Sequence, residues 1–419
     1  MQTPPLPRWL IPRLPFFYGW IVLACACCAG LSRQGGANAT LSVFVSPMTE
    51  AFGWSRTAIS GAVSLGGVLA TLATPVLGRF VDRSGPRLVL CLAVLTTGLA
   101  DLGLSMTNSL AMFYILFCVA RVNFAGPFDL GIYGAVNNWF VARRAIANGI
   151  ATVGQMAGLV LLPMIGSLAM QSGGWPAGWI AIGATVLIVG FVPVFFLMVR
   201  APEDVEQMPD GGFRTAPGPG GAIRPEPSFT RAQAVRTRSF WAISLFTALA
   251  YPVQAGVSLH QAPFLMERGL SPTTAASIVS YFSFVAGVSG FGLGFLPRWI
   301  SVRSKLVGTG LAMGVGAFLY TTVHDTTEGY VAATFFGLGV GALLLMLPVA
   351  WADYFGRRSY GAIRGIALTV QVGAQASGPM ISGALRDATG SYQTPLLCFG
   401  TLAVAGAIAA LFATAPRSP

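Results

Sequence analysis

The stretch Asn138-Trp-Phe-Val-Ala-Arg-Arg144 decides the fold of this chain, because a second version of it occurs in the other half of the sequence. That second version is Tyr354-Phe-Gly-Arg-Arg358. Each copy precedes an apolar stretch with spaced small residues and a proline: Gly149, Gly158, Pro163 and Gly166 after the first, and Gly365, Gly373, Gly378, Pro379 and Gly383 after the second. Glycine rows let membrane helices approach closely. The repetition therefore predicts two related halves, as in membrane proteins built from internal repeats.

Apolar stretches on both sides of these copies are long enough to cross a membrane, which takes about 20 residues in a helix. The chain of 419 residues is 54% hydrophobic and 9% charged, against roughly 25% charged residues in soluble proteins. The predicted spans lie near 17–45, 57–80, 87–106, 110–137, 145–171, 175–199, 239–265, 272–296, 303–323, 328–353, 361–386 and 392–414. We expect an all-α membrane protein with twelve transmembrane helices in two six-helix pseudo-symmetric bundles.

Residues 201–238 interrupt this pattern, since they are rich in proline, glycine and charge. Such a composition is typical of a flexible connector between domains. The predicted domains are therefore an N-terminal six-helix bundle at 1–200, a cytoplasmic connector at 201–238 and a C-terminal six-helix bundle at 239–419.

The positive charges predict how the chain is oriented. If both termini are cytoplasmic, all but five of the 25 lysine and arginine residues lie on the cytoplasmic side. Arg33 and Arg121 fall within spans, and Arg56, Arg268 and Arg386 lie outside. Cytoplasmic loops carry such an excess of positive charge. Lys305 is the only lysine, which fits an arginine-rich bacterial proteome. We expect a multi-pass protein of a bacterial inner membrane with both termini in the cytoplasm.

Several classes of function are disfavoured. The basic residues sit in short loops between apolar stretches, which argues against nucleic acid as a partner of this chain with net charge +11. The six cysteines lie in apolar runs without disulfide or metal spacing. No P-loop, metal-ligand cluster or nucleophile–base pair is apparent. We therefore expect no enzyme activity, no cofactor and no metal site, and the lipid bilayer as the surroundings.

The loop after the second span carries the most specific motif. Gly78-Arg-Phe-Val-Asp82-Arg83-Ser-Gly85-Pro-Arg87 resembles the G-x-x-x-D-R-x-G-x-R loop of the major facilitator superfamily. The resemblance implies that Asp82 and Arg83 take part in gating, by latching one access state. Arg121-Val-Asn-Phe-Ala-Gly126 is similar to an element of that family's fourth helix. The family resemblance also implies a monomer.

Finer features resemble one branch, the monocarboxylate porters and oxalate/formate antiporters. They are Phe17-Tyr18-Gly19-Trp20, Phe52-Gly53-Trp54-Ser55-Arg56, Trp139-Phe140, His260-Gln-Ala-Pro263 and Glu267-Arg268-Gly269-Leu270-Ser271. In that branch an arginine of the eighth helix pairs with the substrate carboxylate, whereas Phe291 occupies the corresponding position here. The loop Gly294-Phe-Leu-Pro-Arg298 also lacks the aspartate of its counterpart in the first half.

Ionisable groups inside spans are costly and usually functional. At 1.5 Å per residue, Arg33 and Arg121 lie roughly 24–26 Å from the cytoplasmic ends of their helices, and Asp129 roughly 13 Å. Asp129 is interpreted as the only deeply placed carboxylate and as unable to neutralise both arginines. We therefore expect a net positive cavity in which Arg33 and Arg121 host an anionic substrate. The alternative for Arg121 is a bond to backbone carbonyls.

Other polar side chains in the spans are candidates for substrate contacts, although each can also be a contact between helices. They are Gln34, Asn38, Tyr133, Gln155, Tyr251, Gln254, Tyr281 and Gln371. Asp129 is a candidate proton carrier or, alternatively, part of a salt bridge at the cytoplasmic gate. His260, near the outer end of the seventh span, can titrate near neutral pH.

Two functions are consistent with this sequence. The first is a secondary active transporter that moves a small, monocarboxylate-like organic anion across the inner membrane by alternating access, as a symporter or an exchanger. The alternative is a proton-coupled efflux transporter for drugs or metabolites, which Phe291 and the aromatic content favour.

Overall fold

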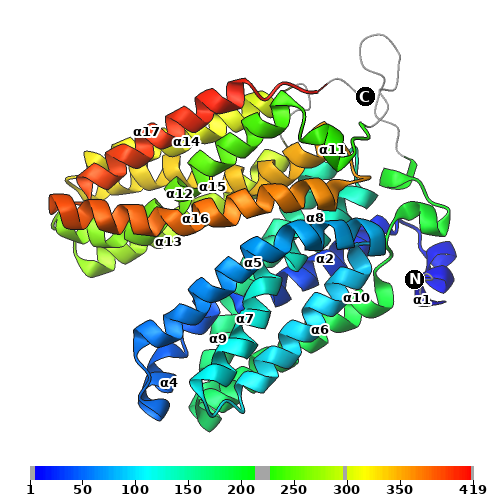
Figure 1. Cartoon of the computed structure of the whole chain (residues 1–419), viewed down its shortest axis with the longest axis horizontal. Coiled ribbons are helices and arrows are strands. Elements are labelled where there is room, and N and C mark those ends of the chain that lie inside the picture. The colour runs from blue at the N-terminus through cyan, green and yellow to red at the C-terminus, as the bar shows by residue number, and fades with distance from the viewer. Residues whose placement is uncertain (1–4, 213–226, 296–299, 417–419) are drawn as a thin grey trace. The chain divides into compact units, whose positions relative to one another are not determined.

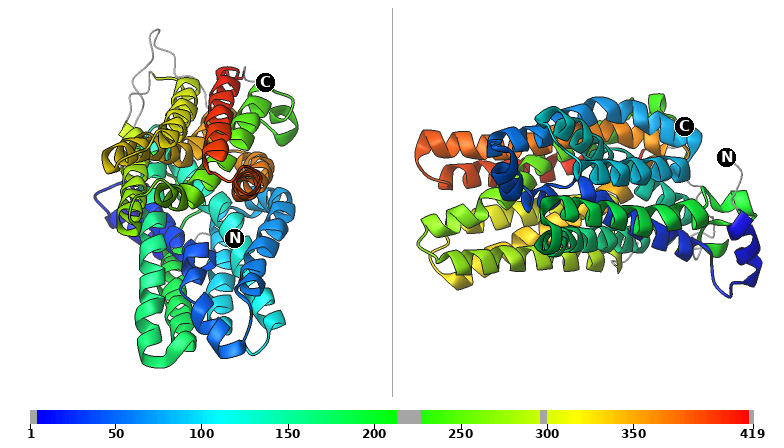
Figure 2. Two further views of the ribbon diagram at one scale, coloured as in Figure 1. Left: turned by 90° about the vertical axis from the view of Figure 1, so that its left-hand side faces the viewer. Right: turned by 90° about the horizontal axis from the view of Figure 1, so that it is seen from below.

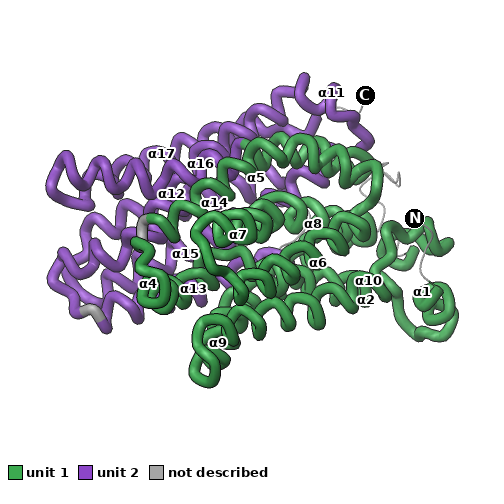
Figure 3. Tube along the Cα trace, turned by 60° about the horizontal axis from the view of Figure 1, so that its bottom comes forward, with its two compact units in different colours: residues 1–226, 356–369 green, residues 227–355, 370–419 purple. Residues whose placement is uncertain are grey.

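The computed structural model describes residues 5–212, 227–295 and 300–416, and within these ranges it contains helices and no strand (Figure 1). The chain forms two compact units (Figure 3). The N-terminal unit comprises Met1–Glu226 together with Gly356–Thr369, and the C-terminal unit comprises Pro227–Phe355 and Val370–Pro419.

The long helices of the N-terminal unit run alongside one another, as Figure 2 shows in two views, and short helices accompany them. They are α1 (Pro5–Leu10), α2 (Gly19–Arg33), α3 (Asn38–Ser42), α4 (Val45–Phe52), α5 (Arg56–Ser84), α6 (Pro86–Leu104), α7 (Leu110–Ala125), α8 (Pro127–Trp139), α9 (Arg144–Thr185) and α10 (Val192–Leu197). Shorter turns are η1 (Ile11–Arg13), η2 (Gln34–Gly36) and the π-helical η3 (Val186–Phe191). Ser109 caps α7 by accepting a hydrogen bond from the backbone N–H of Met112.

Glycine and proline interrupt these helices where the sequence predicts weak points. The first predicted span divides at η2, after which Ala37 is extended and α3 begins. The fourth span divides at Gly126, so that α7 ends at Ala125 and Pro127 opens α8. Gly174, with φ of +65°, separates the fifth and sixth spans within α9. Glycine adopts this left-handed conformation without the penalty that a side chain imposes.

The C-terminal unit has the same kind of long helices. They are α11 (Arg231–Ala234), α12 (Arg238–Glu267), α13 (Pro272–Gly292), η6 (Leu293–Phe295), α14 (Val302–Thr321), α15 (Thr326–Phe355), α16 (Tyr360–Thr389) and α17 (Gln393–Leu411). The first turns of α16, as far as Thr369, pack with the N-terminal unit, and the remainder belongs to the C-terminal unit.

All twelve predicted spans are helical, which confirms the predicted fold class. Eight helical stretches in the described ranges are long and apolar enough to cross a membrane by themselves. One of them, Arg144–Leu197, covers two predicted spans. The break after Arg33 leaves α2 with 15 residues, so it does not reach this length.

The first part of the predicted connector forms two short helical turns. Residues 201–212 form the turns η4 (Pro202–Val205) and η5 (Pro209–Gly212), while residues 213–226 lie outside the described ranges. The carboxylate of Asp210 accepts hydrogen bonds from the backbone N–H groups of Val141, Ala142 and Arg143 at 2.9, 2.6 and 3.1 Å. These bonds fix η5 beside the start of α9.

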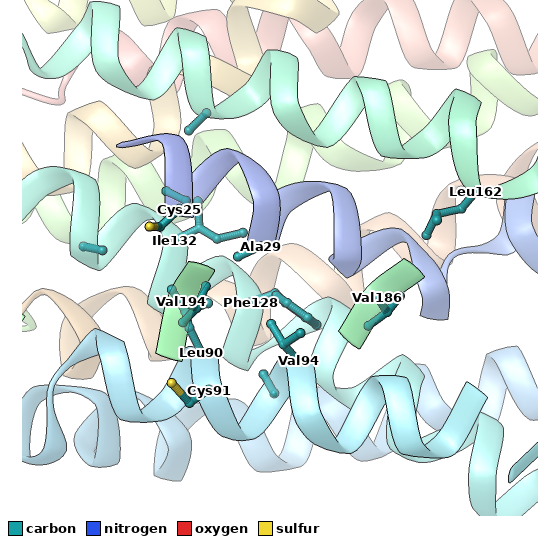
Figure 4. Packing of buried hydrophobic residues seen from close by; sticks show 14 of the residues in the cluster. Cys25, Ala29, Leu90, Cys91, Val94, Phe128, Ile132, Leu162, Val186 and Val194 are labelled. Carbon is teal, nitrogen blue, oxygen red and sulfur yellow. The ribbon is translucent and has the colours of Figure 1, made fainter. Parts of the chain in front are cut away.

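The core of the N-terminal unit is apolar and closely packed. Figure 4 shows Ala29 of α2, Val94 of α6 and Phe128 of α8 among the buried side chains of this cluster. Glycines of α9 bring α2 close to it: an added Cβ at Gly154 or Gly158 would collide with backbone atoms of α2. This close approach determines which side chains Arg33, at the end of α2, can reach.

Candidate substrate and coupling site

Arg33 lies at the last turn of α2 and contacts three other helices. Its Nε donates a hydrogen bond to the carbonyl oxygen of Phe124 on α7 at 2.8 Å. Its Nη1 donates to Oε1 of Gln155 on α9 at 2.5 Å and lies 3.8 Å from Oδ2 of Asp129 on α8. Because α2 ends at this residue, the guanidinium group lies at the junction of α2, α7, α8 and α9.

Asp129 pairs with a second arginine, Arg364, which was counted among the cytoplasmic charges in predicting the orientation. Arg364, in the second turn of α16, has a side chain that is 1% exposed, and its Nε lies 3.3 Å from Oδ1 of Asp129. Asp129 therefore pairs with Arg33 and with Arg364, which was not predicted as a partner. Gly361 and Gly365 of α16 and Gly78 of α5 bring the two backbones into contact, so the first turns of α16 reach Asp129.

A chain of hydrogen bonds extends from Arg33 through Gln155. Gln155 Nε2 donates to the hydroxyl oxygen of Tyr133 at 3.1 Å, and that hydroxyl lies 3.3 Å from Oγ1 of Thr152. The structure thus brings together four of the predicted site residues, Arg33, Asp129, Tyr133 and Gln155. Thr152 completes the chain and was not predicted.

Arg121 approaches the same place from α7. Its Nη1 donates to the carbonyl oxygen of Gly36 at 3.3 Å, and its buried Nε has no hydrogen-bond partner among the described residues. The Cζ atoms of Arg33 and Arg121 lie 4.6 and 4.7 Å from the centre of the Phe124 ring. Two guanidinium groups thus share one aromatic ring, an arrangement favoured by cation–π attraction but opposed by their like charge.

The other predicted residues are distributed over both units. Gln34 is buried in η2 and Asn38 is exposed at the start of α3. The remaining four belong to the C-terminal unit: Tyr251 and Gln371 are buried, Gln254 accepts a hydrogen bond from Gln375 at 3.2 Å, and Tyr281 accepts one from Thr334 at 3.1 Å. They are not part of the cluster around Arg33 within the N-terminal unit.

His260 and Phe291 also belong to the C-terminal unit. The Nδ1 atom of His260 lies 3.1 Å from the carbonyl oxygen of Gly256, and its ring centroid lies 5.3 Å from that of Tyr392. Phe291 is 41% exposed and packs edge-on against Phe295. Its side chain provides no charge at the position where the family branch has an arginine.

Asp82 contacts the beginning of α16. Its two carboxylate oxygens accept hydrogen bonds from the backbone N–H groups of Gly361 and Ala362, both at 2.7 Å. The first N–H groups of a helix have no partner within the helix and carry a partial positive charge, so a carboxylate stabilises them. Arg83 is exposed.

A cavity of about 300 Å³ lies beside this contact and is lined in part by Arg200, Glu203, Arg357 and Arg358. Arg357 crosses its wall, donating to Oε1 of Glu203 at 2.5 Å and to the carbonyl oxygen of Asn138 at 2.9 Å. The cavity does not include Arg33 or Arg121.

A second buried carboxylate within the spans, which was not predicted, lies in α6. Asp101 of α6 is fully buried, and neither of its oxygens has a hydrogen-bond partner among the described residues. Asp129 is therefore not the only deep carboxylate. The signal was present, because Asp101 interrupts the apolar run Thr97-Gly-Leu-Ala-Asp-Leu-Gly-Leu104 of a predicted span.

Comparison with known proteins agrees with this architecture. The sequence profile described as Major Facilitator Superfamily matches residues 22–379. Monocarboxylate transporter 4 of Rattus norvegicus is 25% identical over 91% of this chain and 80% of its own length. A probable L-galactonate transporter of Escherichia coli (strain K12) is 23% identical over 90% of this chain and 85% of its own length. The solved proton:xylose symporter XylE superposes with a TM-score of 0.70, covering 93% of this chain and 94% of XylE at 14% identity.

Proposed function

The chain belongs to the major facilitator superfamily of secondary transporters, and from this premise we propose that it carries a small organic anion, monocarboxylate-like in its chemistry, across the membrane by alternating access. Arg33 and Arg121 are the proposed hosts of the anionic group. Gln155 and Tyr133 are the proposed neutral contacts.

The observation that carries this proposal is the excess of guanidinium over carboxylate groups around Phe124. Among the described residues, the guanidinium group of Arg121 contacts a carbonyl oxygen and an aromatic ring but no carboxylate, and the carboxylate of Asp129 is shared by Arg33 and Arg364. A buried charge without a counter-ion is costly. A carboxylate substrate would supply the missing negative charge, and guanidinium groups bind carboxylates through charge-assisted hydrogen bonds.

The relatives support the same chemistry. The two transporters named above are described as acting on monocarboxylates and on L-galactonate, which is itself a sugar carboxylate. Because identity to both is 25% or lower, the substrate class is our proposal for this chain. We further propose that the protein resides in a bacterial inner membrane with both termini in the cytoplasm, and that release of Asp82 from α16 accompanies the change of access.

The test is binding and transport by the purified protein and its variants. We expect radiolabelled L-lactate or L-galactonate to enter proteoliposomes that contain the wild type. Losing one charge-assisted hydrogen bond costs about 1.5–3 kcal/mol, so Arg33→Ala should weaken binding roughly ten- to hundredfold. The affinity of Arg33→Lys should lie between those of the wild type and Arg33→Ala, because lysine keeps the charge but not the planar guanidinium group.

A matched control is Arg386→Ala, which removes an exposed arginine of the C-terminal unit and should leave affinity unchanged. Unchanged affinity in Arg33→Ala would contradict the role of Arg33. The alternative function, efflux of lipophilic cations, has its own outcome: tetraphenylphosphonium, but neither carboxylate, would raise the melting temperature of the wild type. That result would replace the anion proposal.

A further inference from the structure

The second buried acidic side chain of the N-terminal unit, Asp101, is not used by the proposed anion site. Asp101 lies in α6 one turn after Thr97, and its surface exposure is zero. Both of its oxygens lack a hydrogen-bond partner among the described residues. Buried polar groups are nearly always hydrogen-bonded, so an unpartnered carboxyl group in a close-packed core requires an explanation.

The position of Asp101 supplies one, because its carboxyl group faces the break in α2. A Cβ added at Gly35 would collide with Oδ2 of Asp101. The carboxyl group therefore lies directly against the backbone of η2 at Gly35, with no side chain between them. Gly35 lies between two arginine contacts: Arg33 is two residues earlier, and Gly36 accepts the hydrogen bond from Arg121. Any movement of Asp101 relative to η2 therefore affects both proposed anion hosts.

Charged and titratable groups on the neighbouring helices have other contacts. Arg33 of α2 bonds Phe124 and Gln155, Arg121 of α7 bonds Gly36, and Asp129 of α8 pairs with Arg33 and Arg364. On the side of α7, the thiol of Cys118 and the hydroxyl of Tyr114 donate to carbonyls of α5, and Tyr133 of α8 bonds α9. Described residues of η3 and α10 include no ionisable side chain. No described side chain therefore compensates a negative charge on Asp101.

We propose that Asp101 is a proton-binding site that couples proton movement to anion transport, an inference that rests on the proposed function. An ionised carboxylate buried without a partner is far more costly than a neutral carboxyl group, so Asp101 carries a proton in this state. When the proton leaves to water, the carboxylate requires a cation. The two arginines connected to η2 then become its partners, in competition with the substrate anion.

This competition fixes the direction of coupling. The arginines are available to the anion only while Asp101 is protonated, so proton and anion bind together and move in the same direction. The step transfers one proton between the carboxyl group and water, and no other bond is formed or broken. An anion carrying one negative charge therefore crosses without net charge.

Two transport assays in proteoliposomes separate coupling from binding. Accumulation of L-lactate driven by an inward proton gradient requires proton movement, whereas exchange of internal for external L-lactate does not. Asp101→Asn keeps the shape of the protonated side chain and should retain exchange, while the ratio of accumulation to exchange falls at least tenfold. Asp387→Asn, which alters an exposed carboxylate, should retain both. Gradient-driven accumulation by Asp101→Asn at the wild-type ratio would overturn the proposal.

A second measurement needs no substrate, so it keeps this inference distinct from the proposed function. Infrared spectra of the purified protein at neutral pH should contain the C=O stretch of a protonated carboxyl group, which shifts in D2O and is missing from Asp101→Asn. A wild type with this band that transports neither L-lactate nor L-galactonate would contradict the anion function and still support the proton site. Identical spectra of the wild type and Asp101→Asn would overturn the proton site, whatever is transported.

Discussion

Asp129 pairs with two arginines that lie far apart in the sequence. Its side chain is 6% exposed and lies 3.8 Å from Nη1 of Arg33 and 3.3 Å from Nε of Arg364. In low-dielectric surroundings, the removal of one partner from such a pair leaves the other charge uncompensated. The carboxylate is therefore required for stability as well as for placing Arg33.

We expect Asp129→Asn to destabilise the protein strongly, by about 3–5 kcal/mol, because the amide retains the shape but loses the charge. The melting temperature of purified protein in detergent measures this effect. Asp387→Asn is the matched control, because the side chain of Asp387 is 80% exposed. This variant should unfold at the same temperature as the wild type. Equal melting temperatures for Asp129→Asn and the wild type would show that the pairs with Arg33 and Arg364 contribute little.

At the residue scale, the rule that ionisable groups in spans are functional predicted Arg33, Arg121 and Asp129, which lie in one cluster. Applied consistently, the same rule would also have found Asp101. Arg364 is the fourth residue of the predicted span 361–386, and its place at the start of the span led us to count it with the cytoplasmic charges instead. Only the close contact of α5 and α16 places it inside.

At the element scale, the position of Arg33 depends on how closely α2 approaches α9. A Cβ at Gly158 would collide with the backbone of Leu31, whereas Gly67 of α5 has no atom within 4 Å of the corresponding position. Glycine rows of this kind were visible in the sequence, but which glycine faces a neighbouring helix depends on packing. Because Gly158 contacts a neighbouring backbone and Gly67 does not, these two positions form a matched pair for substitution.

We expect Gly158→Ala to destabilise the protein by about 1–3 kcal/mol, because overpacking forces the backbones apart. Gly67→Ala should be neutral or stabilising by about 0.4–1 kcal/mol, since alanine has less freedom in the unfolded chain. Thermal unfolding compares the two, and exchange of L-lactate should fall only in Gly158→Ala. Similar stability of both variants would mean that α2 can move away from α9 without cost.

The fifth helix of each repeat begins beside a carboxylate that comes from another segment of the chain. Asp82 accepts hydrogen bonds from the first N–H groups of α16, and Asp210 accepts them from three N–H groups just before α9. Asp82 comes from the loop motif at residues 78–87 of the first half, whereas the corresponding loop of the second half has no aspartate. The connector supplies the second carboxylate instead. This residue, Asp210, lies in a segment rich in proline, glycine and charge, from which we predicted only flexibility.

We expect Asp210→Ala to free the start of α9, because three backbone N–H groups lose their acceptor. Amide hydrogen exchange of residues 141–147 should become faster than in the wild type, while peptides from α12 should be unchanged. Glu206→Gln, at an exposed position of the same connector, is the control. Unaltered exchange at residues 141–147 in Asp210→Ala would show that these bonds do not hold the segment.

At the scale of the whole molecule, hydropathy and repetition were sufficient to predict twelve helical spans, since the bilayer dictates both length and composition. They could not show that Gly356–Thr369 packs with the N-terminal unit. That assignment depends on glycine contacts and on the hydrogen bonds of Asp82, which leave no periodic trace in the sequence. Packing between segments far apart in the chain is thus the part of the structure that could not be predicted from this sequence.

The orientation in the membrane is the remaining prediction at this scale. Arg364 is buried and no longer counts as a loop charge, but the other cations assigned to the cytoplasmic side outnumber Arg56, Arg268 and Arg386 by a wide margin. This bias, rather than net charge, sets topology. In a background with the six cysteines replaced, Gly221→Cys in the connector should react with a membrane-impermeant maleimide only after the cells are permeabilised. Thr327→Cys, at an exposed position in the first turn of α15, should react in intact cells. The reverse pattern would place Asp82, Asp210 and the connector outside the cell, and proton-driven accumulation would then run from the opposite side.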